Sequence, residues 1–162
     1  MVRINARVFA GLFAVLLAAL AASSYGLAAA EELSDEQKRV IAANTAFYQA
    51  FSHRDVAAME EIWSRREDVA VIHPGWPGIS GREEVMRSWQ LIMAGPGSPE
   101  VESVNPVAYV MEDSAFVVTY EQVGGGFLIA TNIFALEDGA WRMVHHQAGP
   151  TPRPEGPAGD PI

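Results

Sequence analysis

The side chains available for chemistry in this sequence are histidines, carboxylates, hydroxyls and amides, because the chain contains no cysteine. Thiolate metal sites, cysteine nucleophiles and disulfides are therefore excluded. Of the four histidines, His73 has the most informative position, since it ends a short β-prone run and precedes a Pro-Gly turn. An unperturbed imidazole has a pKa of about 6.5 and is a competent base near neutral pH. We expect His73 to be the catalytic acid or base of an enzyme, or else to cap the turn through backbone hydrogen bonds.

His145 and His146 are adjacent in another β-prone run, so their side chains point to opposite faces of a regular strand. Only one of them can then enter a pocket, and both stay candidates for it. Strict alternation divides the run into two sets, and the sequence does not decide which set faces inward. These sets are Trp141, Met143, His145 and Gln147, and Arg142, Val144, His146 and Ala148.

Metal and phosphate sites have little support in the sequence. A metal site would need His73, one of the adjacent histidines and a carboxylate such as Glu121, and no ligand spacing favours that combination. The run Gly124-Gly125-Gly126 does not precede a helix, so it is expected to form a turn rather than to bind phosphate. We therefore expect neither a metal nor a cofactor.

Aromatic side chains and amides could form the walls of a ligand pocket, because such walls are mainly apolar with a few polar groups. Trp76, in a Gly-Trp-Pro-Gly turn, is placed as a lid. Core packing is the competing explanation for the other aromatic residues. Internally hydrogen-bonded structural amides are the competing explanation for Asn44 and Asn132. The candidates besides His145 and His146 are Tyr48, Trp63, Trp76, Trp89 and Asn132.

Length and charge restrict the class of protein. The chain has 162 residues, enough for one ordinary domain. Eleven basic residues against 20 acidic ones give a net charge of −9, which lacks the basic surface that binding to phosphate backbones requires. Nucleic acid is therefore not an expected partner.

The first 30 residues have the pattern of a signal peptide. Arg3 and Arg7 precede an uncharged apolar run from Val8 to Ala22, and Ala28-Ala29-Ala30 offers a small-residue cleavage site. The run is shorter than the ~20 residues that span a bilayer, although an uncleaved anchor is the alternative. Cleavage after Ala30 would leave 132 residues and change the net charge from −9 to −11. We expect a periplasmic or secreted protein with no stable membrane association.

Capping signals and apolar periodicity predict three helices in the first part of the remaining chain. Ser34 with Gln37 forms a capping box, Asp55 can cap the second helix, and Ser80 with Glu83 forms another capping box. The expected inner faces are Val40, Asn44, Phe47, Tyr48 and Phe51; Val56, Met59, Ile62 and Trp63; and Val85, Met86, Trp89, Ile92 and Met93.

The β-prone runs predict a short first hairpin and then a four-stranded antiparallel meander. Residues 69–72 can pair with residues 78–80, and the meander strands are expected at 101–110, 115–123, 127–136 and 141–147. From Gly149 onwards five of 14 residues are proline and three are glycine, which predicts a disordered tail at 151–162. The domain is then 31–150, of the α+β class, with helices over one face of a curved sheet and a concave pocket between them.

Three motifs occur together and in order: Val71-Ile72-His73-Pro74-Gly75, Gly81-Arg82-Glu83-Glu84-Val85, and the run from Asp138-Gly139-Ala140-Trp141 to His145-His146. They resemble the SnoaL-like branch of the nuclear transport factor 2-like superfamily over about Glu36 to Pro150. The resemblance implies a ketosteroid isomerase-like fold, with three N-terminal helices covering a cone-shaped antiparallel sheet of about six strands, and a homodimer formed through sheet faces. It implies no single activity, because the superfamily includes isomerases, polyketide cyclases, dehydratases and non-catalytic dimerisation domains.

The resemblance also implies positions for catalytic groups. His73 falls where the ketosteroid isomerases carry the carboxylate that moves the proton. The oxyanion-binding tyrosine would fall on Phe47, which has no proton to donate, with Tyr48 beside it. The second oxyanion donor would fall at or next to Thr131, which joins the candidate pocket residues. Two of the three expected groups are thus absent.

The leading prediction for function is that the exported domain binds a small, largely apolar molecule in the cone pocket. The first alternative is a cofactor-independent isomerase, cyclase or dehydratase that uses His73 as acid or base. The second alternative is a non-catalytic dimerisation module, comparable to the hub domain of calcium/calmodulin-dependent protein kinase.

Overall fold

The computed structural model describes residues 32–154, which form three helices and six strands. The helices are α2 (Asp35–Ser52), α3 (Val56–Ile62) and α4 (Arg82–Ala94). The strands are β1 (Ala70–Ile72), β2 (Ile79–Ser80), β3 (Val101–Met111), β4 (Ser114–Val123), β5 (Gly126–Glu137) and β6 (Ala140–Thr151). The predicted signal peptide at 1–30 and most of the predicted tail lie outside the described residues. No described helix is both long and apolar enough to span a membrane.

The helix starts follow the capping signals in two of three cases. The Ser34 hydroxyl accepts from the Gln37 amide and the Gln37 side chain accepts from the Ser34 amide, as the capping box requires. Asp55 caps α3 by accepting from the Ala58 amide at 2.9 Å. The predicted box of Ser80 and Glu83 is wrong, because Gly81 is the N-cap of α4, with φ of 90°, and makes no side-chain cap. Ser80 instead belongs to strand β2.

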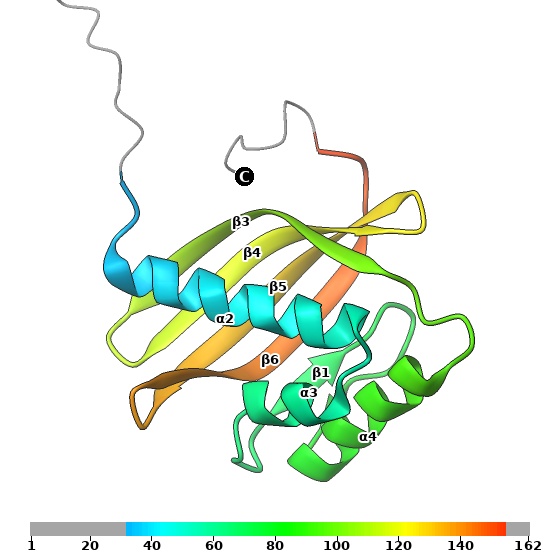
Figure 1. The fold of residues 1–162 in the computed structure, drawn as a ribbon, viewed down its shortest axis with the longest axis horizontal. Helices are drawn as coiled ribbons and strands as arrows, with labels where there is room; N and C mark the ends of the chain where they lie inside the picture. The colour runs from blue at the N-terminus through cyan, green and yellow to red at the C-terminus, as the bar shows by residue number, and fades with distance from the viewer. Residues whose placement is uncertain (1–31, 155–162) are drawn as a thin grey trace, which may run out of the picture. The chain divides into compact units, whose positions relative to one another are not determined.

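The sheet has the strand order β2-β1-β6-β5-β4-β3. Strands β3 to β6 form the expected antiparallel meander, and β1 pairs antiparallel with β2. The expectation of an entirely antiparallel sheet fails at one edge, where β1 runs parallel to β6, from Ala70 beside His145 to Ile72 beside Gln147. Residues 73–139 separate β1 from β6 in the chain, so no tight turn joins these two strands, and parallel neighbours require such a longer connection. The sheet is therefore mixed and open, and the three helices lie on one of its faces (Figure 1).

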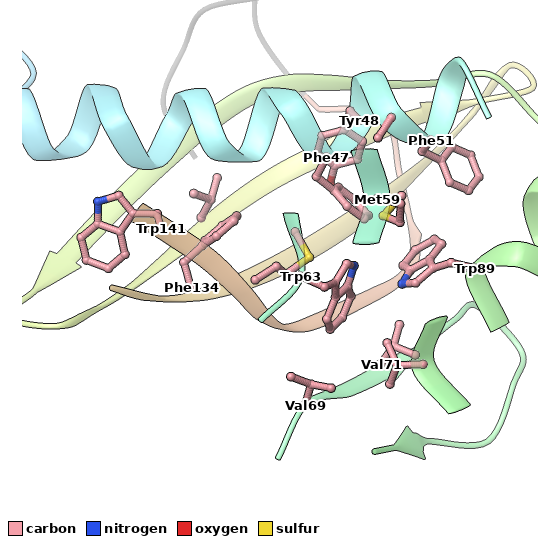
Figure 2. Close-up of a cluster of buried hydrophobic side chains, with 14 of the residues drawn as sticks. Phe47, Tyr48, Phe51, Met59, Trp63, Val69, Val71, Trp89, Phe134 and Trp141 are labelled. Carbon is pink, nitrogen blue, oxygen red and sulfur yellow. The ribbon is translucent and has the colours of Figure 1, made fainter. Parts of the chain in front are cut away.

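The core lies between this sheet face and the helices. Figure 2 shows its rings along α2, from Trp141 and Phe134 near one end to Phe51 and Trp89 near the other. The predicted inner stripe of α2 is confirmed, since each of its members is buried. In α4 the predicted face is buried except for Ile92, which is partly exposed.

Arg82 joins the start of α4 to the end of α3. Its guanidinium donates to three backbone carbonyls, those of Glu60, Trp63 and Ser64. These acceptors would otherwise remain unpaired at a helix C-terminus, where backbone carbonyls have no intrahelical partner. Hydrogen bonds to a charged donor of this kind each stabilise by about 1.5–3 kcal/mol.

We predict that Arg82→Met lowers the free energy of unfolding by about 2 kcal/mol, measured by urea denaturation. The matched control is Arg87→Met on the same helix, whose guanidinium pairs only with exposed Glu83 and Glu84. Exposed ion pairs contribute less than about 1 kcal/mol. Equal losses from the two substitutions would contradict the structural role assigned to Arg82.

Candidate functional site

A cavity of about 450 Å³ opens between α2, α4, the turn after β1 and the ends of strands β3 to β6. Its volume lies in the range of small-molecule sites. Five predicted site residues line it: His73, Tyr48, Trp76, Trp89 and His146. Most of the remaining wall is apolar, and it is formed by Phe47, Phe51, Pro74, Ile92, Pro99, Val101, Val123, Phe127 and Leu128.

A β-bulge in β6 decides which of the two adjacent histidines enters this cavity. Met143 pairs with Phe134 and His145 pairs with Ile133, so Val144 is left as an extra residue in the strand. The bulge shifts the alternation by one residue, and His146 joins Trp141 and Met143 on the buried face. Both sets derived from strict alternation are therefore wrong beyond Val144. Of the two adjacent histidines, His146 lines the cavity and His145 does not.

A chain of hydrogen bonds connects the polar side chains at the inner end of the cavity. The Tyr48 hydroxyl donates to Glu121 Oε1 at 2.8 Å and accepts from the Asn132 amide at 3.1 Å. The same amide donates to Asn44 Oδ1 at 2.7 Å, and Asn132 Oδ1 lies 2.6 Å from His146 Nδ1. The two buried asparagines are thus satisfied structural amides, as their competing explanation proposed. Asn132 does not line the cavity but holds two residues that do.

Glu121, on β4, is the polar residue that the sequence analysis missed as a pocket group and named only as a conceivable metal ligand. It is 4% exposed, lines the cavity and has no cationic partner among the described side chains. Burial raises its pKa to about 7, while the hydrogen bond from Tyr48 opposes the rise. A sequence signal existed, since Ala115, Val117 and Thr119 alternate inward and the same period reaches Glu121.

His73 directly follows β1 and lies at the other side of the cavity. Its Nε2 lies 2.9 Å from the Ser88 hydroxyl, which itself donates to the Val85 carbonyl, so Nε2 carries a proton and donates to Ser88. Its ring also packs edge-on against Trp89 and Trp76, with centroids 4.5 and 5.2 Å away. Burial lowers the pKa of His73 to about 4, so the imidazole is neutral at physiological pH.

The other predicted pocket residues lie elsewhere. Trp63 is wholly buried in the core, 6.3 Å from Trp89 between ring centroids. Thr131 and His145 neighbour inward-facing residues in their strands and are not part of the cavity wall. Trp76 lies at the cavity wall and is 43% exposed, which is the geometry expected of a lid.

Within residues 32–154 no group of three or more histidines and carboxylates is arranged to hold a metal ion. Glu121 Oε1 and His146 Nε2 are 4.0 Å apart. Chemically, the cavity therefore offers one carboxyl group able to exchange a proton near neutral pH and two neutral imidazoles, His146 at the inner end and His73 at the other side, inside apolar walls. Such a set can bind an uncharged polar group or move a proton.

Three solved structures show the same architecture. A candidate dehydratase of the NTF2-like family from Streptomyces avermitilis is 31% identical, with a TM-score of 0.67 over 73% of this chain and 97% of that one. A candidate association domain of calcium/calmodulin-dependent protein kinase type II from Thiobacillus denitrificans is also 31% identical, with a TM-score of 0.60 over 68% and 94%. A ketosteroid isomerase-like protein from Erwinia carotovora atroseptica, 17% identical with a TM-score of 0.61, covers 75% of this chain and is wholly covered itself, and shows the fold alone.

Sequence comparison extends the likeness to a plant protein. F-box protein SKIP8 of Arabidopsis thaliana is 31% identical over 113 residues, which are 68% of this chain and 49% of that protein. The chain thus spans about half the length of this relative. A family model described as a SnoaL-like domain matches residues 40–152, from within α2 to the residue after β6. The chain therefore belongs to the SnoaL-like domain family, with the NTF2-like fold that its three sequence motifs had indicated.

Proposed function

We propose that this protein binds a small, largely apolar molecule in the cavity between α2, α4 and the sheet. The single observation that carries the proposal is a cavity of about 450 Å³ whose aromatic and aliphatic walls end in one buried carboxyl group, Glu121. Apolar walls with a few fixed polar groups are the usual composition of small-molecule sites. An assembly module without a ligand would have no need to bury a carboxyl group in this way, at a cost in solvation.

A second candidate function is cofactor-independent proton transfer, as in an isomerase, cyclase or dehydratase. A carboxyl group with a pKa of about 7 is suited to act as acid and base at neutral pH. The pKa of His73, about 4, makes its imidazole a weaker base, so Glu121 replaces His73 as the favoured proton carrier. The likeness to a candidate dehydratase is consistent with this chemistry. If it occurs, Glu121 would give its proton to the substrate or take one from it, with Tyr48 held against Oε1.

We also infer that two copies of the chain associate through the uncovered face of the sheet, as the family resemblance implied. This face carries half-buried apolar side chains, including Val118 and Ile129, and the stacked rings of Tyr109 and Phe116 at 4.6 Å. Tyr109 remains 44% exposed. All described helices lie on the opposite face (Figure 1), so a second copy would provide the missing cover.

Native mass spectrometry of the full chain, purified gently from the cells that produce it, tests ligand binding. We expect each protomer to carry a small additional mass. Leu128→Trp, which fills the cavity from β5, should remove that mass, whereas Ile129→Trp on the opposite face should keep it. An identical adduct in both variants, or none in the wild type, would contradict the proposal.

The pH dependence of stability tests the environment of Glu121. Because its pKa rises from 4.5 in the unfolded chain to about 7 in the fold, its contribution is complete below pH 4.5 and is lost as pH rises through about 7. The loss amounts to about 3 kcal/mol. Glu121→Gln should therefore gain stability relative to wild type over this range, in urea denaturation at a series of pH values. His73 and His146 have the opposite effect on the pH dependence of stability, because burial lowers their pKa values. Wild type and Glu121→Gln both contain these histidines, so their effect cancels in the comparison. Parallel curves for the two proteins would show that the carboxyl group is not buried as described.

Light scattering after size exclusion tests the dimer. Val118→Asp adds a carboxylate to the centre of the uncovered face and should shift the protein towards monomer, because an unpaired charge is costly to bury in an interface. Gln122→Asp adds the same group on the same strand and face but outside the apolar area, and should leave the dimer intact. A monomeric wild type would refute the dimer without bearing on the cavity.

A further inference from the structure

The hydrogen bonds behind the cavity fix which nitrogen of His146 carries the proton. The Asn132 amide nitrogen donates to Asn44 Oδ1 and to the Tyr48 hydroxyl, so the Asn132 oxygen is directed at His146. A carbonyl oxygen can only accept a hydrogen bond. His146 Nδ1, 2.6 Å away, must therefore donate to it, and in a neutral ring Nε2 is then left without a proton.

The unprotonated Nε2 of His146 has no hydrogen-bond partner among the described residues. It belongs to a residue that lines the cavity, and it lies 4.0 Å from Glu121 Oε1, too far for a direct hydrogen bond. Nε2 is not one of the fully buried atoms without a partner, so it keeps access to the cavity, where a ligand or a water can supply the donor. His146 is 4% exposed, which leaves the cavity as the side from which that donor can come.

Glu121 supplies the complementary group. Its Oε1 accepts from Tyr48, so a proton held by this carboxyl group resides on Oε2, which has no hydrogen-bond partner among residues 32–154. The inner end of the cavity then presents one acceptor, His146 Nε2, and one donor, the protonated Glu121. A group that both donates and accepts through a single atom, such as a hydroxyl, can satisfy the two together.

Charge at the site argues against an ionic ligand. Among residues 32–154 no lysine or arginine lines the cavity, so an anion would lose its hydration without gaining a counter-ion there. Burial shifts both His146 and Glu121 towards their neutral forms, and the same desolvation acts on a charged group that enters. An ammonium group could donate to His146 Nε2 and pair with Glu121 in its ionised form, but it would have to leave its own hydration to enter the apolar cavity.

We propose that the cavity selects uncharged molecules in which an apolar body ends in a hydroxyl group, with that hydroxyl donating to His146 Nε2 and accepting from Glu121. His146 is then a specificity-determining residue, and Asn132 is the positioning residue that sets its tautomer. This inference rests on the proposed ligand binding and adds to it the chemical class of the ligand.

Four probes with the same bicyclic body test the selection by isothermal titration of the full chain at pH 7: naphthalen-2-ylmethanol, its methyl ether, naphthalen-2-ylmethylamine and 2-naphthoate. We expect the alcohol to bind about tenfold more tightly than the ether, the loss expected for one hydrogen bond. The amine and the carboxylate should each bind at least about tenfold more weakly than the alcohol. Tighter binding of either charged probe, or equal binding of alcohol and ether, would overturn the proposal.

A matched pair of variants assigns the selection to His146. His146→Phe keeps a ring but removes the acceptor, so the ratio of alcohol to ether affinity should fall to within about twofold. His145→Phe makes the same change at the neighbouring residue outside the cavity wall and should leave the ratio unchanged. A ratio retained in His146→Phe would overturn the assignment.

The tautomer itself can be measured without any ligand and without a substitution that could unfold the chain. In ¹⁵N-labelled wild-type protein, the two- and three-bond correlations of the His146 ring should show Nδ1 protonated and Nε2 bare. A protonated Nε2 would overturn the inference whatever the probes do. If Nε2 is bare but none of the four probes binds, the proposed binding of an apolar molecule is contradicted. The proposed selection of a hydroxyl group, which rests on that binding, is then contradicted with it, while the tautomer of His146 is confirmed.

Discussion

A carboxyl group buried without a cation is the constraint on which the rest of this site depends. Water would stabilise the charge of Glu121, and the apolar cavity does not, so the protein must provide hydrogen bonds or let the group bind a proton. It does both. Tyr48 donates to one oxygen, and the pKa rises to about 7. Tyr48 in turn needs Asn132, which is held by Asn44, so one buried acid determines the placement of three further polar side chains.

The hydrogen-bonded side chains of that network come from both the helical layer and the sheet. Asn44 and Tyr48 come from α2, Glu121 from β4, Asn132 from β5 and His146 from β6. Because α2 crosses the strands of the meander (Figure 1), two of its polar side chains can meet three separate strands. The aromatic rings of Figure 2 exclude water around this crossing, and low dielectric strengthens each hydrogen bond there. The hydrophobic core and the wall of the cavity are therefore formed partly by the same side chains, such as Phe47, Tyr48 and Trp89.

Comparison with the relatives shows that this fold by itself does not specify a function. Chains about equally similar to this one are described as a candidate dehydratase and as a candidate kinase association domain, and a plant F-box protein contains a similar segment. The two solved relatives share the fold of this chain, with TM-scores of 0.67 and 0.60. Function must then come from the side chains that each member places on the shared fold. In this protein these side chains include a buried acid with an acceptor beside it, and no cationic side chain from the described part of the chain lines the cavity.

The sequence by itself determined the helices, the meander and the family, because caps, apolar period and turn residues are local signals. Of the candidate pocket residues named from the sequence, His73, Tyr48, Trp76 and Trp89 lie at the cavity wall, whereas Trp63, Thr131 and His145 lie elsewhere. Only the tertiary structure decided that His146 rather than His145 faces inward, because the bulge at Val144 is a property of strand pairing. Only the tertiary structure revealed Glu121 as the central group, since its pKa depends on burial by segments distant in the chain. The same holds for the parallel pairing of β1 with β6, which no local pattern encodes.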